Sequence, residues 1–388
     1  MPDDVSQREL DPRAGEAVAL PATGAAHAPS GLFGRHLPGL DGWRALAVSA
    51  VVLCHATAWL ATPPLRHETW ARLTRLGAHG VDAFFVLSGL LITGRLLEEQ
   101  KMNGAIRLRS FYVRRAARIL PAALLYLLVI GVVALRGVIR VWPLAWWSAL
   151  LFVRNDLPHV RAGDWYTGHF WTLAIEEQFY LVWPTLVLLV SARRLSCRLP
   201  LLLAAFTVWR WWAFRHLGDW AGMSFYERSD IRLDGLAWGA WLAVLLQRGV
   251  PRPRISIHWL RATALTLGGL YAWVLWTQPH LNQTLEGFCL AGLLGLTILW
   301  PQAGLVRLLE LPPLRWLGRL SYSLYLWQQY CFPPPGLRAS GWCGRLQGGL
   351  SGLLVLFLLA SGSYYLLERR CLKAGQRKAA TLGMGTSP

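Results

Sequence analysis

Long apolar runs recur along this chain, and they constrain its fold more than any other feature. A helix needs about 20 apolar residues to cross a bilayer, and it satisfies its backbone hydrogen bonds internally, as the hydrocarbon core requires. Because 54% of the residues are hydrophobic and only 15% are charged, we expect an all-α polytopic integral membrane protein embedded in the lipid bilayer. About ten spans are predicted, roughly at 41–61, 78–97, 119–135, 169–190, 199–214, 231–246, 257–277, 281–300, 315–332 and 348–367.

The regions outside these spans complete the predicted layout. The stretch 141–153 is rich in Trp but too short to cross, which favours an interfacial or re-entrant segment. Residues 1–37 combine Pro, Ala, Gly and scattered charge without an apolar period, so we expect a disordered N-terminal tail. The membrane-embedded domain then covers 38–372, and a C-terminal tail covers 373–388.

Basic residues outnumber acidic ones, 39 against 21. In a soluble protein this excess would indicate a nucleic-acid partner, but here the basic residues lie mainly between apolar runs, and we expect no such partner. They are concentrated on the side of the termini, which predicts that both termini are cytoplasmic. The six cysteines are scattered without any Cys-x-x-Cys pair, so neither a metal site nor a disulfide framework is expected.

The first predicted span carries two polar residues that a purely apolar helix would lack. Arg44 lies near its start and His55 lies eleven residues later, about three turns and about 16 Å along a helix. Both side chains therefore project from nearly the same face. A cation at the membrane surface and an imidazole in the interior suit an enzyme that draws an anionic donor towards a buried reaction centre. The alternative is that Arg44 anchors the helix at the membrane surface and that His55 forms a hydrogen bond between two helices.

A second basic motif precedes the third span. Arg115 and Arg118 are three residues apart, so both point the same way from a helix that enters the membrane. Paired guanidinium groups bind phosphates well, because the planar fork makes two hydrogen bonds at once. Ordinary positive-inside anchoring is the alternative.

Carboxylates inside apolar runs are costly and indicate function. Asp82 lies in the second span, where it could orient a cation or a histidine. Glu176 and Glu177 are adjacent in the fourth span, so at most one is expected to share a cavity with His55 and to orient its ring. A structural salt bridge from either glutamate to Arg232 or Arg210 is the competing interpretation.

Two later spans also carry polar side chains. Arg232 and Asp234 open the sixth span, where they predict either an internal ion-pair network or contacts to acceptor hydroxyls. Tyr322 lies in the ninth span among serines, Trp327 and Gln328. That composition is typical of a polar, carbohydrate-lined cavity and equally of hydrogen-bonded helix packing.

Several of these stretches together resemble the membrane-bound acyltransferase 3 family of O-acyltransferases, whose members acylate surface polysaccharides, O-antigens, Nod factors or macrolides. The resemblance covers nearly all of 38–372 and rests on the order of its motifs. These are Leu-Asp-Gly-Trp-Arg44 through His55, Phe-Phe-Val-Leu-Ser-Gly-Leu-Leu-Ile-Thr93, Arg115-Ala-Ala-Arg118, Trp171-Thr-Leu-Ala-Ile-Glu-Glu-Gln-Phe-Tyr180, Arg232-Leu-Asp234 and the ninth span. Thr172 and Gln328 depart from the commoner Ser and His.

The resemblance implies a multi-pass enzyme of the bacterial cytoplasmic (inner) membrane that uses an acyl-CoA, most often acetyl-CoA. Arg44, Arg115 and Arg118 are then expected to bind the donor's phosphates. His55 is expected to act as general base on a sugar or glycan hydroxyl, oriented by Glu176 or Glu177. Asp82, Arg232, Asp234 and Tyr322 are assigned to the acceptor. A two-step route through an acylated residue, and a proton-coupled transporter or flippase that uses the same buried charges, are the alternatives.

Overall fold

The computed structural model describes residues 32–33, 36–60, 68–157, 164–217, 225–249, 257–276 and 283–384, and these residues form helices and connecting turns without a strand. The predicted all-α class is therefore confirmed for this part of the chain. The α-helices are α1 (Leu40–Leu60), α2 (Glu68–Asn103), α3 (Leu108–Leu135), α4 (Pro143–Leu150), α5 (Trp165–Gly168), α6 (Phe170–Leu189), α7 (Ala192–His216), α8 (Ser229–Arg248), α9 (Ile257–Trp276), α10 (Gln283–Leu299), α11 (Gly304–Leu309), α12 (Pro312–Cys331), α13 (Gly341–Arg345), α14 (Gly349–Gly362) and α15 (Arg369–Met384). Short 3-10 turns lie at Arg154–Asp156, Phe225–Glu227 and Pro335–Leu337, and a π-helical turn, η5, covers Ser363–Glu368.

Each of the ten predicted spans coincides with a helix, but the number of membrane crossings is not confirmed. Among the described residues, three helical stretches are long and apolar enough to cross a membrane: His79–Asn103, Leu108–Leu135 and Gly349–Leu382. The short Trp-rich stretch forms α4 and the turn after it, in keeping with a segment too short to cross. Nearly all of the predicted N-terminal tail lies outside the described residues.

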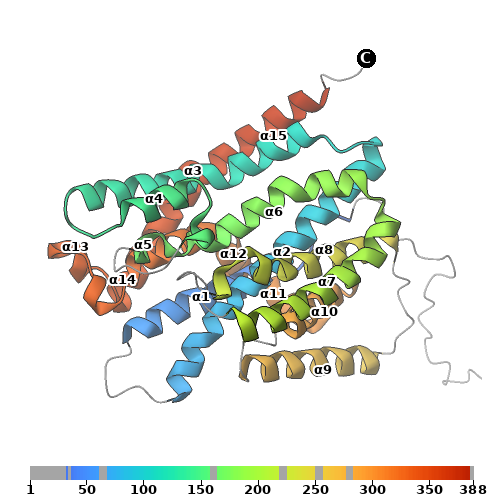
Figure 1. Ribbon diagram of the computed structural model, residues 1–388, viewed down its shortest axis with the longest axis horizontal. Coiled ribbons are helices and arrows are strands. Elements are labelled where there is room, and N and C mark those ends of the chain that lie inside the picture. The colour runs from blue at the N-terminus through green and yellow to red at the C-terminus, as the bar shows by residue number, and fades with distance from the viewer. Residues whose placement is uncertain are drawn as a thin grey trace, which may run out of the picture.

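A group of four helices occupies the centre of the bundle. Helix α1 packs against α2 and α12, and α2 packs against α8. Helices α7 and α10 flank α8, and α9 lies against α10 at one edge (Figure 1). At the opposite edge α3 and α15 lie side by side (Figure 1). The motifs on α1, α2, α6 and α12, which are far apart in the sequence, are thereby brought to the middle of the molecule.

Glycines allow the central helices to approach one another closely. A Cβ atom on Gly239 of α8 would collide with the backbone carbonyl of Val86 on α2, and one on Gly89 of α2 would collide with that of Leu236. The same holds for Gly318 of α12 against α1. Without a hydrophobic drive between helices in lipid, such small-residue contacts are a main source of packing energy. Gly89, in the second predicted span, therefore belongs to a close helix contact.

The segment predicted as a C-terminal tail is helical up to Met384. Residues 349–384 run from α14 through the π-helical turn into α15, which packs along the start of α3. Ser110 of α3 donates a hydrogen bond to the carbonyl of Ala379 (3.0 Å), and Gly375 faces Ala117 closely. In the π-helical turn the Glu368 carboxylate accepts hydrogen bonds from Ser323 and Ser363. Helix α15 thus belongs to the folded domain.

We expect Gly239→Ala to destabilise the protein, because the added methyl group must push α8 away from the α2 backbone. The cost should fall in the range of about 1–3 kcal/mol known for overpacked cores. Thermal unfolding of the detergent-solubilised protein measures it. Gly268→Ala on α9 is the matched control, since a Cβ there meets open space. Equal unfolding temperatures for the two variants would contradict the close approach of α2 and α8.

Candidate active site

A cavity of about 340 Å³ lies among α1, α2, α3, α6, α12 and α15. Its lining includes a strongly basic set of residues and a set that carries hydroxyls and one carboxylate. The basic part comprises Arg44, Arg95, Arg114, Arg115 and Arg118. The other part comprises Ser88, Thr172, Glu176, Tyr180, Ser321, Tyr322 and Tyr325. This volume is that of a typical small-ligand site.

The three arginines predicted from separate motifs meet in this cavity. Arg44 lies on α1, whereas Arg115 and Arg118 lie on α3. Arg44 has a distant carboxylate neighbour, with 3.7 Å between its Nη1 and Asp41 Oδ1. Neither Arg115 nor Arg118 has a carboxylate within ion-pair distance among the described residues, although the Arg115 guanidinium lies 5.0 Å from the centre of the Tyr180 ring. These two guanidinium groups therefore keep their N–H donors available for an anion.

Only one of the two adjacent glutamates lines the cavity. Glu176 accepts hydrogen bonds from Ser88 Oγ (2.8 Å) and Tyr180 Oη (3.2 Å), which hold its carboxylate on the cavity wall. Glu177 points elsewhere, and its buried Oε1 makes no hydrogen bond. Neither forms the salt bridge to Arg210 or Arg232 that was the competing interpretation, because those arginines bind aspartates instead.

His55 lies outside the cavity wall, and no glutamate among the described residues forms a hydrogen bond with its ring. Its Nδ1 lies 2.9 Å from the backbone carbonyl of Val51, one turn earlier in α1. A carbonyl only accepts, so Nδ1 carries the proton and Nε2 keeps the lone pair that a general base needs. The ring packs edge-on against Trp165, with 5.5 Å between ring centres. The imidazole is thus oriented by its own helix and an aromatic neighbour.

A second histidine, His169, lies beside Tyr325, which is part of the cavity wall. Tyr325 and Thr172 both line the cavity and share a hydrogen bond of 2.7 Å. The Tyr325 ring lies 5.6 Å from that of His169. His169 donates both its backbone N–H and Nδ1–H to Gln329 Oε1 (3.1 and 2.7 Å), so its buried Nε2 is free.

Sequence reasoning assigned no role to His169 or Tyr325. His169 is the N-cap residue of α6 and precedes Thr172 by three residues, and Tyr325 follows Tyr322 by three residues in α12. That spacing was the available signal. Tyr322 itself does line the cavity, and its hydroxyl donates to the carbonyl of Ile119 (2.8 Å).

The other three residues assigned to the acceptor form ion pairs away from the cavity. Arg232 Nη2 lies 2.8 Å from Asp82 Oδ1, and Arg210 Nη2 lies 2.5 Å from Asp234 Oδ2. The Arg232 guanidinium also lies 5.4 Å from the centre of the Trp171 ring. The structure thus contains the internal ion-pair network that was one of the two alternatives. Acceptor contacts by Asp82, Arg232 and Asp234 stay a prediction.

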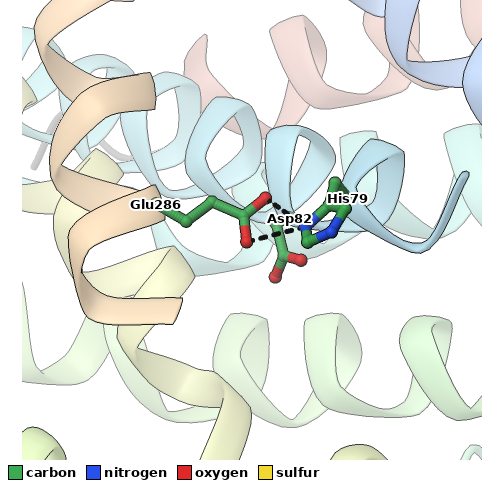
Figure 2. A group of neighbouring side chains, drawn as sticks. All are labelled: His79, Asp82 and Glu286. Carbon is green, nitrogen blue, oxygen red and sulfur yellow. Dashed lines mark hydrogen bonds and ion pairs between the residues drawn. The ribbon is translucent and has the colours of Figure 1, made fainter. Parts of the chain in front are cut away.

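This network continues to His79 of α2 and Glu286 of α10, which Figure 2 shows beside Asp82. Both carboxylate oxygens of Glu286 lie 2.9 Å from His79 Nδ1. One ligand atom from each of the three residues lies within 4.8 Å of the others, a spacing that a metal centre also has. However, His79 is bonded to Glu286, and Asp82 is paired with Arg232, whose positive charge opposes a cation. We therefore interpret the group as part of the ion-pair network.

Several known proteins are similar to this chain in amino-acid sequence. A family profile described as an acyltransferase domain matches residues 37–367. The chain is 30% identical over 325 residues to the peptidoglycan O-acetyltransferase OatA of Listeria monocytogenes, covering 76% of this chain and 49% of that protein. It is 32% identical over 339 residues to the putative peptidoglycan O-acetyltransferase YrhL of Bacillus subtilis, covering 76% and 48%. A putative O-acetyltransferase of Staphylococcus aureus is 29% identical over 331 residues, covering 76% and 50%.

The chain thus spans about half the length of the curated relatives that it matches. No solved structure matches it. The matched region begins just before α1 and ends within the π-helical turn, so it contains every helix that contributes to the cavity except α15. Because the family profile covers most of the sequence, the chain belongs to the acyltransferase 3 family.

Proposed function

We propose that this protein is a membrane O-acetyltransferase that moves an acetyl group from cytoplasmic acetyl-CoA to a hydroxyl of a sugar or glycan. The observation that carries the proposal is the meeting of Arg44, Arg115 and Arg118 in one cavity, where Arg115 and Arg118 have no carboxylate within ion-pair distance in the part of the chain that the structure describes. The names of the relatives support an O-acetyl product on a glycan. A multi-pass location in the bacterial inner membrane, with both termini cytoplasmic, is part of this proposal.

The charges of the cavity suit the donor. An acyl-CoA carries phosphates at one end and a neutral thioester at the end of a long, flexible arm. The arginines would bind the phosphates through bidentate hydrogen bonds. The hydroxyl-bearing part of the lining, with Thr172, Tyr322 and Tyr325, is neutral apart from Glu176 and would accept the pantetheine arm. The predicted axial separation of Arg44 and His55, about 16 Å in a helix, is on the order of the length of that arm.

The transfer itself needs a base and a path to it. His55 Nε2 would take the proton of the acceptor hydroxyl while the hydroxyl oxygen forms a bond to the thioester carbonyl carbon. The carbon–sulfur bond then breaks, and the proton on His55 passes to the departing thiolate. Because His55 is not among the residues that line the cavity, side chains of the cavity wall must move to admit the thioester to His55.

We expect Arg118→Ala to raise the KM for acetyl-CoA by about 10-fold to 100-fold, the range for loss of a hydrogen bond to a charged group. Arg118→Lys should recover only part of this, because an ammonium group keeps the charge without the fork. Initial rates of thiol release with peptidoglycan oligosaccharides as acceptor measure both. Arg109→Ala, on the same helix but outside the cavity, is the control. An unchanged KM in Arg118→Ala would remove this residue from the donor site.

We expect His55→Ala to lower the rate of transfer by about 10²- to 10⁴-fold while the protein remains folded, since general-base help is worth that much. Transfer of radioactive acetyl groups to the same oligosaccharides measures the rate, and thermal unfolding reports the fold. His216→Ala is a matched control, because the Nδ1 atom of this exposed histidine likewise lies 2.8 Å from the carbonyl one turn earlier. A folded His55→Ala variant with undiminished transfer would exclude His55 as the base.

A further inference from the structure

A second cavity, of about 310 Å³, adjoins the first at its basic end. It lies between the end of α2, the start of α3 and the outer part of α15, on the side of the membrane predicted to be cytoplasmic. Glu99, Arg114 and Gln376 line both cavities. The two spaces are therefore neighbours that share a wall.

The shared wall is made by an ion pair. Arg114 Nη2 lies 3.1 Å from Glu99 Oε2, and Glu99 Oε1 accepts a hydrogen bond from the backbone N–H of Arg107 (3.1 Å). The carboxylate thus holds one edge of the Arg114 guanidinium and leaves its other N–H groups available. The Arg114 side chain is 40% exposed, so a ligand can reach it.

Arg107 gives the second cavity a cation of its own. Its side chain is exposed on the cavity wall and has no carboxylate within ion-pair distance among the described residues. With Arg107 and Arg114 against the single carboxylate of Glu99, the lining carries a net positive charge. Asn103 adds an amide on the same wall, which offers both a donor and an acceptor.

The shape of the donor explains why such a space is needed. If the phosphates of the diphosphate lie on Arg44, Arg115 and Arg118 and the arm points inward, the adenosine end must lie outward of these residues. That end carries a further phosphate on its ribose. A cavity on the outward side, adjoining the first and lined by two arginines and an amide, has the charge and polarity that an adenosine 3′-phosphate requires.

We propose that the second cavity binds the adenosine 3′-phosphate end of the acyl-CoA donor, with Arg107 and Arg114 on the 3′-phosphate and α15 as one wall. This inference rests on the proposed function. It assigns to α15 a part in donor binding, and it makes the protein selective for CoA over shorter thioesters.

The experiment compares two donors that differ only in the ribose phosphate, acetyl-CoA and acetyl-3′-dephospho-CoA. In Arg107→Ala we expect the KM for acetyl-CoA to rise by about 10-fold or more, as for loss of a charged hydrogen bond. The KM for acetyl-3′-dephospho-CoA should stay unchanged. Arg109→Ala, exposed on α3 but outside both cavities, should change neither value. Ala380→Trp, which fills the second cavity, should raise both values while leaving transfer from acetyl-pantetheine intact.

Binding of adenosine 3′,5′-bisphosphate, measured by calorimetry on the purified protein, gives a readout that does not depend on turnover. We expect binding to the unsubstituted protein and a loss in Arg107→Ala. Equal effects of Arg107→Ala on both donors, or no effect on either, would overturn the subsite. Arg107-dependent binding of the bisphosphate by a protein that transfers no acetyl group would instead overturn the proposed reaction and retain the subsite.

Discussion

The structure depends on ion pairs that compensate charges buried away from water. In the described part of the bundle, Arg210 Nη2 lies 2.5 Å from a carboxylate oxygen of Asp234, and Arg232 Nη2 lies 2.8 Å from one of Asp82. Removing one partner of such a buried pair costs about 3–5 kcal/mol, so these contacts hold α2, α7 and α8 in one arrangement. Arg115 and Arg118 are the exceptions, because neither has a carboxylate within ion-pair distance among the residues that the structure describes. This absence supports the proposal that an anionic ligand binds there.

Close helix packing decides which residues can share that site. Gly89 and Gly239 let α2 and α8 touch through their backbones, and Gly318 does the same for α12 and α1. As a consequence Arg44 on α1, Glu176 on α6 and Tyr322 on α12 line one cavity. Helix α15 then closes the basic end against α3. The C-terminal helix thereby becomes part of the site although it lies beyond the matched family region.

Local structure sets the tautomer of one histidine, and tertiary structure sets that of another. The His55 tautomer is set by the hydrogen bond from Nδ1–H to the carbonyl of Val51 in its own helix, a local contact that any histidine in a helix can make. The His169 tautomer is set by the hydrogen bond from Nδ1–H to the side chain of Gln329, which is 160 residues away in the sequence. Both keep Nε2 free to accept a proton. The sequence predicted that a glutamate orients His55, because a buried carboxylate beside an imidazole fixes its tautomer and raises its basicity. In the structure the Glu176 carboxylate accepts hydrogen bonds from Ser88 and Tyr180 instead.

The sequence by itself determined the all-α class, the position of each predicted helix and three of the arginines that line the cavity, Arg44, Arg115 and Arg118. Helix formation depends mainly on neighbouring residues, so the length and hydropathy of each apolar run and the spacing of its polar residues suffice to predict it. Only the tertiary structure decided that Glu176 rather than Glu177 faces the cavity, that Asp82 and Asp234 pair with arginines, and that α15 belongs to the site. These outcomes depend on how helices rotate and pack against distant partners, which a single sequence does not encode locally.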